Sequence, residues 1–144
     1  HLMAEISTFE SRTGRVGCSA GTAFDFLTDL RNFKRFIPGN SIRDLVLDSD
    51  SCSFQADMLG TVTIHISEKW HPEKIIYSGT MPQVKDFSMS VDIRENPEGN
   101  SDVKLSIRAE LNPFLKMMAA EPLKRVLGII IDEMEKFRDW KVAT

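Results

Sequence analysis

The chain has 144 residues, of which 42% are hydrophobic and 27% charged, and its formal net charge is −3. This size and composition are typical of a single globular domain, 1–144, with a sizeable core. The negative charge argues against nonspecific nucleic-acid binding, which depends on neutralising phosphates, and no apolar run approaches the roughly 20 residues of a membrane span.

The start of the chain and its cysteines bear on location. His1-Leu2-Met3 resembles a vector remnant ahead of the native start, so His1 is not expected to belong to a functional site. No positively charged start with a following apolar stretch indicates a signal peptide. Cys18 and Cys52 do not form a CxxC pair and are interpreted as reduced, partly buried thiols. A cytoplasmic location is the expectation.

The first elements are expected to be one strand and two short helices. Residues 5–16 form the strand, and Ser19 is a good N-cap for the first helix. A second helical turn, 32–37, ends at Pro38-Gly39. The inner side of the first helix carries Ala23, Phe24, Phe26, Leu27 and Leu30.

Strands dominate the middle of the chain. Residues 86–95 are apolar at every odd position and 103–111 repeat this alternation, which indicates a sheet with one buried face. Short, turn-rich separators favour antiparallel hairpins. The expected strands are 42–48, 52–58, 61–70, 74–80, 86–95 and 103–111.

The last region is expected to be a short helix, a bend and a long helix. Asn112 caps the short helix with Pro113 at its first position, and Pro122 breaks the run. The long helix includes Leu123 to Trp140 and is apolar at three- and four-residue spacing. At about 1.5 Å per residue it spans roughly 30 Å, enough to cross a small sheet.

This order of elements resembles the START-like or SRPBCC superfamily, whose members have the helix-grip fold. The resemblance is carried by Val16-Gly17-Cys18-Ser19 leading into 23–29, then Phe33 and 36–39. The superfamily includes the birch-pollen allergen family and polyketide cyclases, and residues 112–123 are similar to small uncharacterised bacterial members. The resemblance implies an α+β fold, with a curved antiparallel sheet of about six or seven strands around a long C-terminal helix.

A sheet that curves around one helix can enclose a pocket, so we expect a small hydrophobic or amphipathic ligand to bind between them. The gap between the long helix and the short helices, near Phe33 and Phe36, is the expected entrance. Met and Phe side chains suit a pliable apolar pocket and equally suit a plain core. The expected ligand-binding residues are Phe33, Phe36, Phe54, Met58, Ile64, Trp70, Tyr77, Phe87, Met89, Met118, Leu127, Ile130 and Arg12.

Arg12 and Glu10 have two interpretations. If the first strand alternates regularly back from Val16, both face the cavity, where ionised side chains are costly unless paired. They would then orient a ligand head group or act as an acid–base pair. Alternatively, a bulge or an edge strand turns both to water, and Phe9 packs inward.

Two other functions stay open. No catalytic or metal-ligating set has a diagnostic spacing, and His65 and His71 are interpreted as a solvent-facing strand residue and a turn residue. A cyclase- or dehydratase-like enzyme would depend on Arg12, Glu10 or Tyr77. A protein-interaction module would need no ligand. No cofactor is expected, and a homodimer is left open.

One short segment is unusually apolar for its position. Phe114, Leu115, Met117 and Met118 crowd the stretch between two prolines. A lid over a cavity, a dimer contact and a membrane-touching tip all fit this composition.

Overall fold

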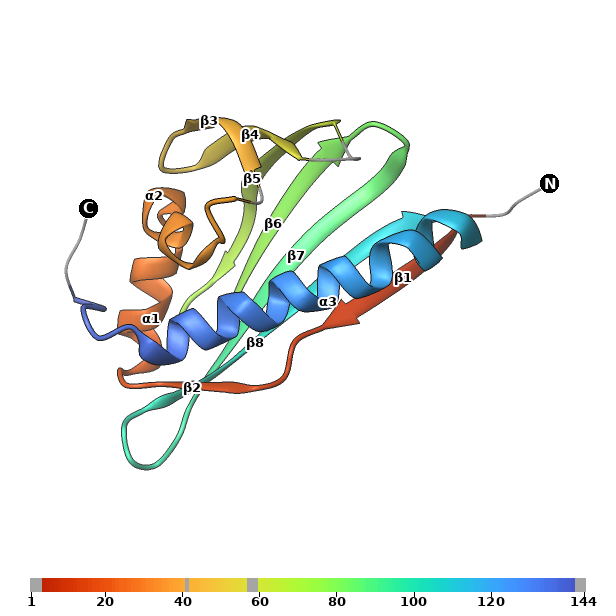
Figure 1. Cartoon of the computed structure of the whole chain (residues 1–144). Coiled ribbons are helices and arrows are strands. Elements are labelled where there is room, and N and C mark those ends of the chain that lie inside the picture. The colour runs from red at the N-terminus through yellow and green to blue at the C-terminus, as the bar shows by residue number, and fades with distance from the viewer. Residues whose placement is uncertain (1–3, 41, 57–59, 142–144) are drawn as a thin grey trace.

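The computed structural model describes residues 4–40, 42–56 and 60–141. A curved antiparallel sheet wraps around the long helix α3, and two short helices lie at one end of it (Figure 1). The expected α+β helix-grip arrangement is confirmed. The elements are β1 (Glu5–Glu10), β2 (Gly14–Val16), α1 (Ala20–Leu27), α2 (Leu30–Phe33), the 3₁₀ turn η1 (Lys34–Phe36), β3 (Ile42–Leu47), β4 (Ser51–Ala56), β5 (Gly60–Trp70), β6 (Lys74–Met81), β7 (Val84–Glu95), β8 (Ser101–Leu111) and α3 (Pro113–Lys136).

The sheet brings the two ends of the chain together. Within the described residues it has eight strands in the order β1-β8-β7-β6-β5-β4-β3, with β2 also paired to β8. Every pairing is antiparallel, and consecutive strands from β3 to β8 are neighbours, as their short connections predict. Because β1 pairs with β8, the N-terminal strand lies beside the last strand and next to α3.

The segment expected as one strand over 5–16 is interrupted. Ser11 leaves the regular pairing: its N–H donates to the Leu105 carbonyl at 2.9 Å, and its hydroxyl accepts from the Leu105 N–H at 2.9 Å. Pairing with β8 resumes at β2. The interruption reverses the alternation of inward and outward side chains. As a result, Phe9 at an odd-numbered position and Val16 at an even-numbered one are both buried.

Both expected helix caps are present, but the expected division into a short and a long helix is not. The Ser19 hydroxyl accepts from the Thr22 N–H at 3.2 Å, and the Asn112 side chain accepts from the Leu115 N–H at 2.9 Å. From Pro113, α3 runs without interruption for 24 residues, with Pro122 inside it. Proline removes one N–H donor from the helix ladder. The remaining bonds and the contacts with the sheet keep the helix continuous.

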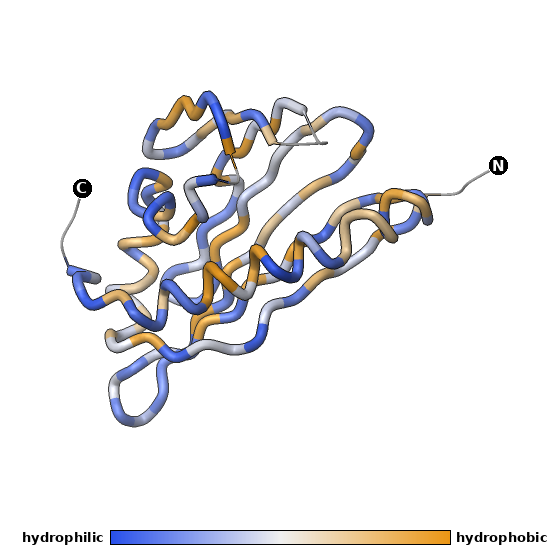
Figure 2. The backbone as a smooth tube through the Cα atoms, viewed as in Figure 1, coloured by the Kyte–Doolittle hydropathy of each residue, from blue (hydrophilic) through white to orange (hydrophobic). Residues whose placement is uncertain are grey.

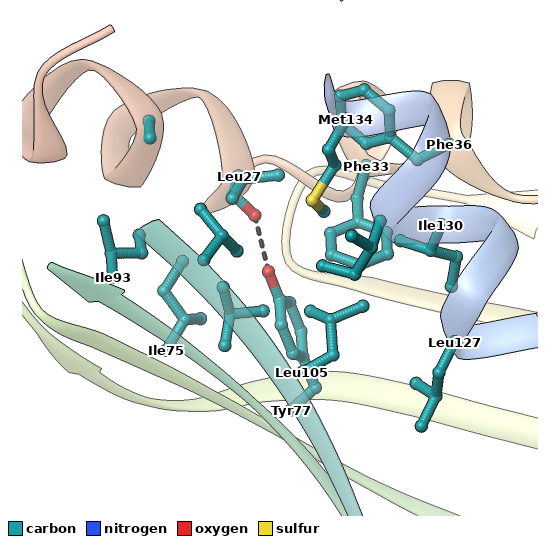
Figure 3. Packing of buried hydrophobic residues seen from close by; sticks show 14 of the residues in the cluster. Leu27, Phe33, Phe36, Ile75, Tyr77, Ile93, Leu105, Leu127, Ile130 and Met134 are labelled. Carbon is teal, nitrogen blue, oxygen red and sulfur yellow. Dashed lines mark hydrogen bonds between the residues drawn. The ribbon is translucent and has the colours of Figure 1, made fainter. Parts of the chain in front are cut away.

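The core lies between the inner face of the sheet and the second half of α3. Ile75, Val91 and Leu105 are aligned across β6, β7 and β8 and are fully buried. Leu127 and Met134 of α3 are also fully buried, and Figure 3 shows the packing of this cluster. The core therefore fixes the second half of α3 on the sheet. Away from the core, the turn between β7 and β8 is hydrophilic (Figure 2).

Candidate functional site

The gap expected as the entrance is filled by aromatic rings. Phe26 lies 5.1 Å from Phe137 and 5.3 Å from Trp140 between ring centroids, and Phe36 stacks on Trp140 at 5.5 Å. Phe33 and Phe36 are each 2% exposed. The expected entrance is therefore wrong, because Phe137 and Trp140, which follow α3, close this end of the molecule.

Tyr77 belongs to the same closed region. Its hydroxyl donates to the Leu27 carbonyl at 2.7 Å, and both residues are fully buried (Figure 3). Burial raises the pKa of the phenol far above its usual value. Leu127 and Ile130 are buried nearby. These expected ligand-binding residues therefore lie in the packed core.

The Arg12 side chain points away from the interior and forms ion pairs with two carboxylates of α3. Its guanidinium donates to Asp132 at 2.5 Å and to Glu135 at 2.6 Å, and the second oxygen of Glu135 accepts from the Arg15 N–H at 2.9 Å. The side chain is 48% exposed. The bond from Arg12, assisted by the Arg15 N–H, lowers the pKa of Glu135. The placement of Arg12 on the cavity face is wrong.

Glu10 also points to solvent, where it pairs with Lys104 at 3.1 Å. Phe9 packs inward and is 4% exposed, which is the alternative interpretation of the first strand. The reason is the interruption at Ser11, which breaks the regular alternation back from Val16. Arg12, Glu10 and Tyr77 therefore do not form an acid–base set.

The first half of α3, taken as residues 113–126, covers the sheet less completely than the second half, residues 127–136. Apolar side chains on its flank are only partly buried, and so are apolar residues on the inner face of β5 and β7. All of them border the buried core. We call this set the open apolar face. It consists of Ile64, Ile66, Phe87 and Met89 from the strands and Leu115, Ala119, Leu123 and Val126 from α3.

The helix flank of this face follows from residue spacing. Leu115, Ala119 and Val126 recur at intervals of one and two helical turns, so they share one side of α3. The side that contacts β2 is different, because a side chain at Gly14 would meet Ile131 at 2.6 Å and Glu135 at 3.4 Å. The apolar flank is therefore turned away from β2, toward the less covered strands.

On the strand side of the open apolar face, Gly79 leaves one position of β6 without a side chain. Ile64, Gly79 and Phe87 are direct cross-strand neighbours on β5, β6 and β7. A Cβ at Gly79 would lie 2.7 Å from the Thr63 carbonyl oxygen and 2.9 Å from a Phe87 ring carbon. The Phe87 ring therefore rests on the bare backbone of Gly79, and any side chain there would displace it.

The chemistry available beside this face is that of an apolar surface. Cys52, the cross-strand neighbour of Ile64, is half-buried, and burial raises the pKa of its thiol. The thiol is therefore neutral near pH 7. The eight side chains of the open apolar face carry no charge. Such a surface can bind apolar parts of a ligand by excluding water, without acid–base chemistry.

The remaining expected residues are dispersed. Phe54 is half-buried on β4, but Trp70 is 60% exposed and Met118 is 44% exposed. Trp70 was expected on the inner stripe; a register shift between Ile66 and Glu68 reverses the alternation, so Trp70 points outward. Met58 lies outside the described residues.

Sequence reasoning missed five residues of the open apolar face as site residues, namely Ile66 on β5 and Leu115, Ala119, Leu123 and Val126 on α3. The spacing of the four helix residues was a usable signal, because they lie within two adjoining helical rows. The expected bend at Pro122 separated the two pairs, so the continuous flank was not recognised.

Other candidate features within the described part of the chain are limited. One hollow of about 200 Å³ lies beside β3, between Lys34 and Leu45, and another of about 250 Å³ lies at β7 and β8 near Asp92. Neither includes the open apolar face. Among residues 4–40, 42–56 and 60–141, no cluster of His, Cys, Asp and Glu could hold a metal ion, and no helix is long and apolar enough to cross a membrane.

The comparisons support the fold. No protein-family model and no curated protein matches the sequence. A norcoclaurine synthase point mutant from Thalictrum flavum, solved in complex with a transition-state analogue, aligns with a TM-score of 0.74 at 10% identity, over 94% of this chain and 96% of that one. XoxI from Bacillus cereus has a TM-score of 0.64 at 12% identity, over 93% and 94%. A START superfamily protein from Mycobacterium smegmatis has 0.63 at 12%, over 91% and 97%. The chain thus has the fold of START-like proteins.

Proposed function

We propose that the protein binds a small hydrophobic or amphipathic molecule on the open apolar face, between the first half of α3 and the inner face of β5 and β7. The observation that carries this proposal is the contrast along α3. Leu127, Ile131 and Met134 are fully buried, whereas Leu115, Ala119 and Val126 are left half-buried, as are Ile64, Phe87 and Met89 on the strands. Half-covered apolar surface gains about 25 cal/mol for each Å² that a ligand removes from water.

The fold comparison supports a small-molecule ligand. Norcoclaurine synthase, which has the same fold, was solved with a transition-state analogue bound. The present chain differs in what its interior offers. The Tyr77 hydroxyl is hydrogen-bonded to the Leu27 carbonyl. At the surface, Arg12 forms an ion pair with Asp132, and Glu10 forms one with Lys104. Binding without catalysis is therefore the function that these side chains favour.

A fluorescence titration with N-phenyl-1-naphthylamine, a neutral apolar probe, tests the location. Ala119→Glu places a carboxylate on the open apolar face, where burying an unpaired charge under a ligand is strongly unfavourable. We expect at least about tenfold weaker probe binding. Lys136→Glu adds a carboxylate on the exposed side of the same helix and should leave the probe affinity unchanged. Equal affinity of the wild type and both variants would overturn the location.

Native mass spectrometry of freshly purified protein tests whether a natural ligand is present. We expect an additional mass that disappears after denaturation, and organic extraction would identify its class. A bare mass together with the absence of probe binding would contradict the proposed function and favour a protein-interaction module.

A further inference from the structure

The first turns of α3 present large apolar side chains to solvent. Phe114 is 57% exposed, Met117 is 71% exposed and Met118 is 44% exposed. Ile6, at the adjoining end of β1 and on the outer face of the sheet, is 62% exposed. These are four of the six large hydrophobic residues that are exposed within the described part of the chain. Figure 2 shows hydrophobic colouring at this end of α3. Such a concentration at one end of a molecule indicates a contact surface.

The charges on the same stretch are predominantly basic. Residues 113–125 include Lys116, Lys124 and Arg125, with Glu121 as the single acid, whereas the whole chain has a net charge of −3. All four charged side chains are exposed. The rest of α3, residues 126–136, carries three acidic residues and one basic residue. Basic residues therefore outnumber acidic ones by three to one on the stretch of α3 that carries the exposed apolar side chains.

We propose that the N-terminal part of α3, residues 113–125, docks on the surface of an anionic phospholipid bilayer. Phe114 and Met117 would enter the headgroup region, and Lys124 and Arg125 would lie against lipid phosphates. A helix with exposed apolar residues beside lysine and arginine has the composition of an interfacial membrane helix. Each basic residue near an anionic leaflet contributes attraction that falls off within a Debye length.

A second copy of the chain fits this surface less well. Phe114, Met117 and Met118 have about 200 Å² of side-chain surface each and are roughly half exposed, so together they offer about 300–400 Å² of apolar surface to a partner. A stable interface requires about 800 Å² on each partner. Two copies would also bring like charges together, since Lys124 and Arg125 would face their own counterparts. The proposal does not depend on the ligand-binding function, because it rests on the opposite, solvent-facing side of α3.

Co-sedimentation with vesicles tests the docking surface. We expect the wild-type protein to bind phosphatidylcholine vesicles that contain phosphatidylserine, and to bind pure phosphatidylcholine vesicles much less. Lys124→Ala combined with Arg125→Ala should weaken binding roughly 25-fold, about fivefold for each basic residue. Met117→Glu should abolish binding. Trp70→Glu, which charges an exposed apolar residue at the opposite end of the sheet, is the matched control and should bind like wild type.

Three results would overturn the proposal. They are no binding of the wild type to anionic vesicles, equal binding to both vesicle types, or an equal loss in Trp70→Glu. Circular dichroism shows whether each variant is folded. If Met117→Glu is unfolded, the variant with both Lys124→Ala and Arg125→Ala still tests the proposal. A dimer in sedimentation velocity that Met117→Glu dissociates, without vesicle binding, would assign the surface to a second copy.

Discussion

Replacing Tyr77 with phenylalanine should destabilise the protein without changing ligand binding. The substitution removes one hydroxyl and keeps the ring, which packs edge-to-face on Phe33 at 5.5 Å. The lost bond is short, at 2.7 Å, and both the hydroxyl and Leu27 are fully buried. The Leu27 carbonyl would lose this partner in a region from which water is excluded. Leaving a buried acceptor unsatisfied costs about 1–3 kcal/mol.

Urea denaturation measures this cost directly. The midpoint should fall while the slope stays constant, because the surface exposed on unfolding is unchanged. For a chain of this size the loss corresponds to a decrease in Tm of about 3–10 °C. Probe affinity should equal that of wild type, since Tyr77 lies in the core and not on the open apolar face. A loss of stability below about 0.5 kcal/mol, or a weakened probe affinity, would refute this reasoning.

Alkaline titration checks the same hydroxyl, because Tyr77 is the single tyrosine in the chain. With its pKa raised by burial, it should ionise only when alkali unfolds the protein; ionisation near pH 10 in the folded state would contradict its burial. Arg12→Met should cost about 1 kcal/mol at neutral pH. Arg12 lowers the pKa of Glu135 in the folded state, so the stability difference between wild type and Arg12→Met is complete above pH 4.5, the ordinary pKa of a glutamate. The difference decreases as the pH falls through the lowered pKa of Glu135. A stability difference that grows on acidification would contradict the ion pair. Gly79→Ala should destabilise by about 1–3 kcal/mol, since its Cβ would press on Thr63 and Phe87. Gly128→Ala, with open space around it in α3, should instead stabilise by about 0.5–1 kcal/mol, so equal effects in thermal denaturation would refute the close approach at Gly79.

Local patterns predicted most of the fold. The alternation in 86–95 and 103–111 corresponds to β7 and β8, and Ser19 and Asn112 cap helices as expected. These features depend on near neighbours in sequence, so periodicity and capping chemistry are enough to identify them. The continuity of α3 through Pro122 was not predictable in this way, because contacts with the sheet compensate for one lost bond.

The candidate site was harder to predict than the fold. Trp70 and Arg12 were misplaced for the same physical reason: a register shift or an interruption of one strand exchanges its two faces. Ile64, Phe87 and Met89 were placed on the inner face as expected, since their alternation is undisturbed. Phe33 and Phe36 were taken as the entrance because the packing of Phe137 and Trp140 against Phe36 is a long-range contact without a local sequence signal.

The most direct test of ligand binding on the open apolar face is methyl NMR of the methionines during titration with N-phenyl-1-naphthylamine. Met89 lies on this face, whereas Met134, on the second half of α3, is fully buried in the core. We predict that ring currents of the bound probe shift the Met89 methyl resonance in a saturable way and leave that of Met134 in place. A saturable shift of Met134 with Met89 unchanged would contradict the account, because the ligand would then enter the core that the structure shows to be filled.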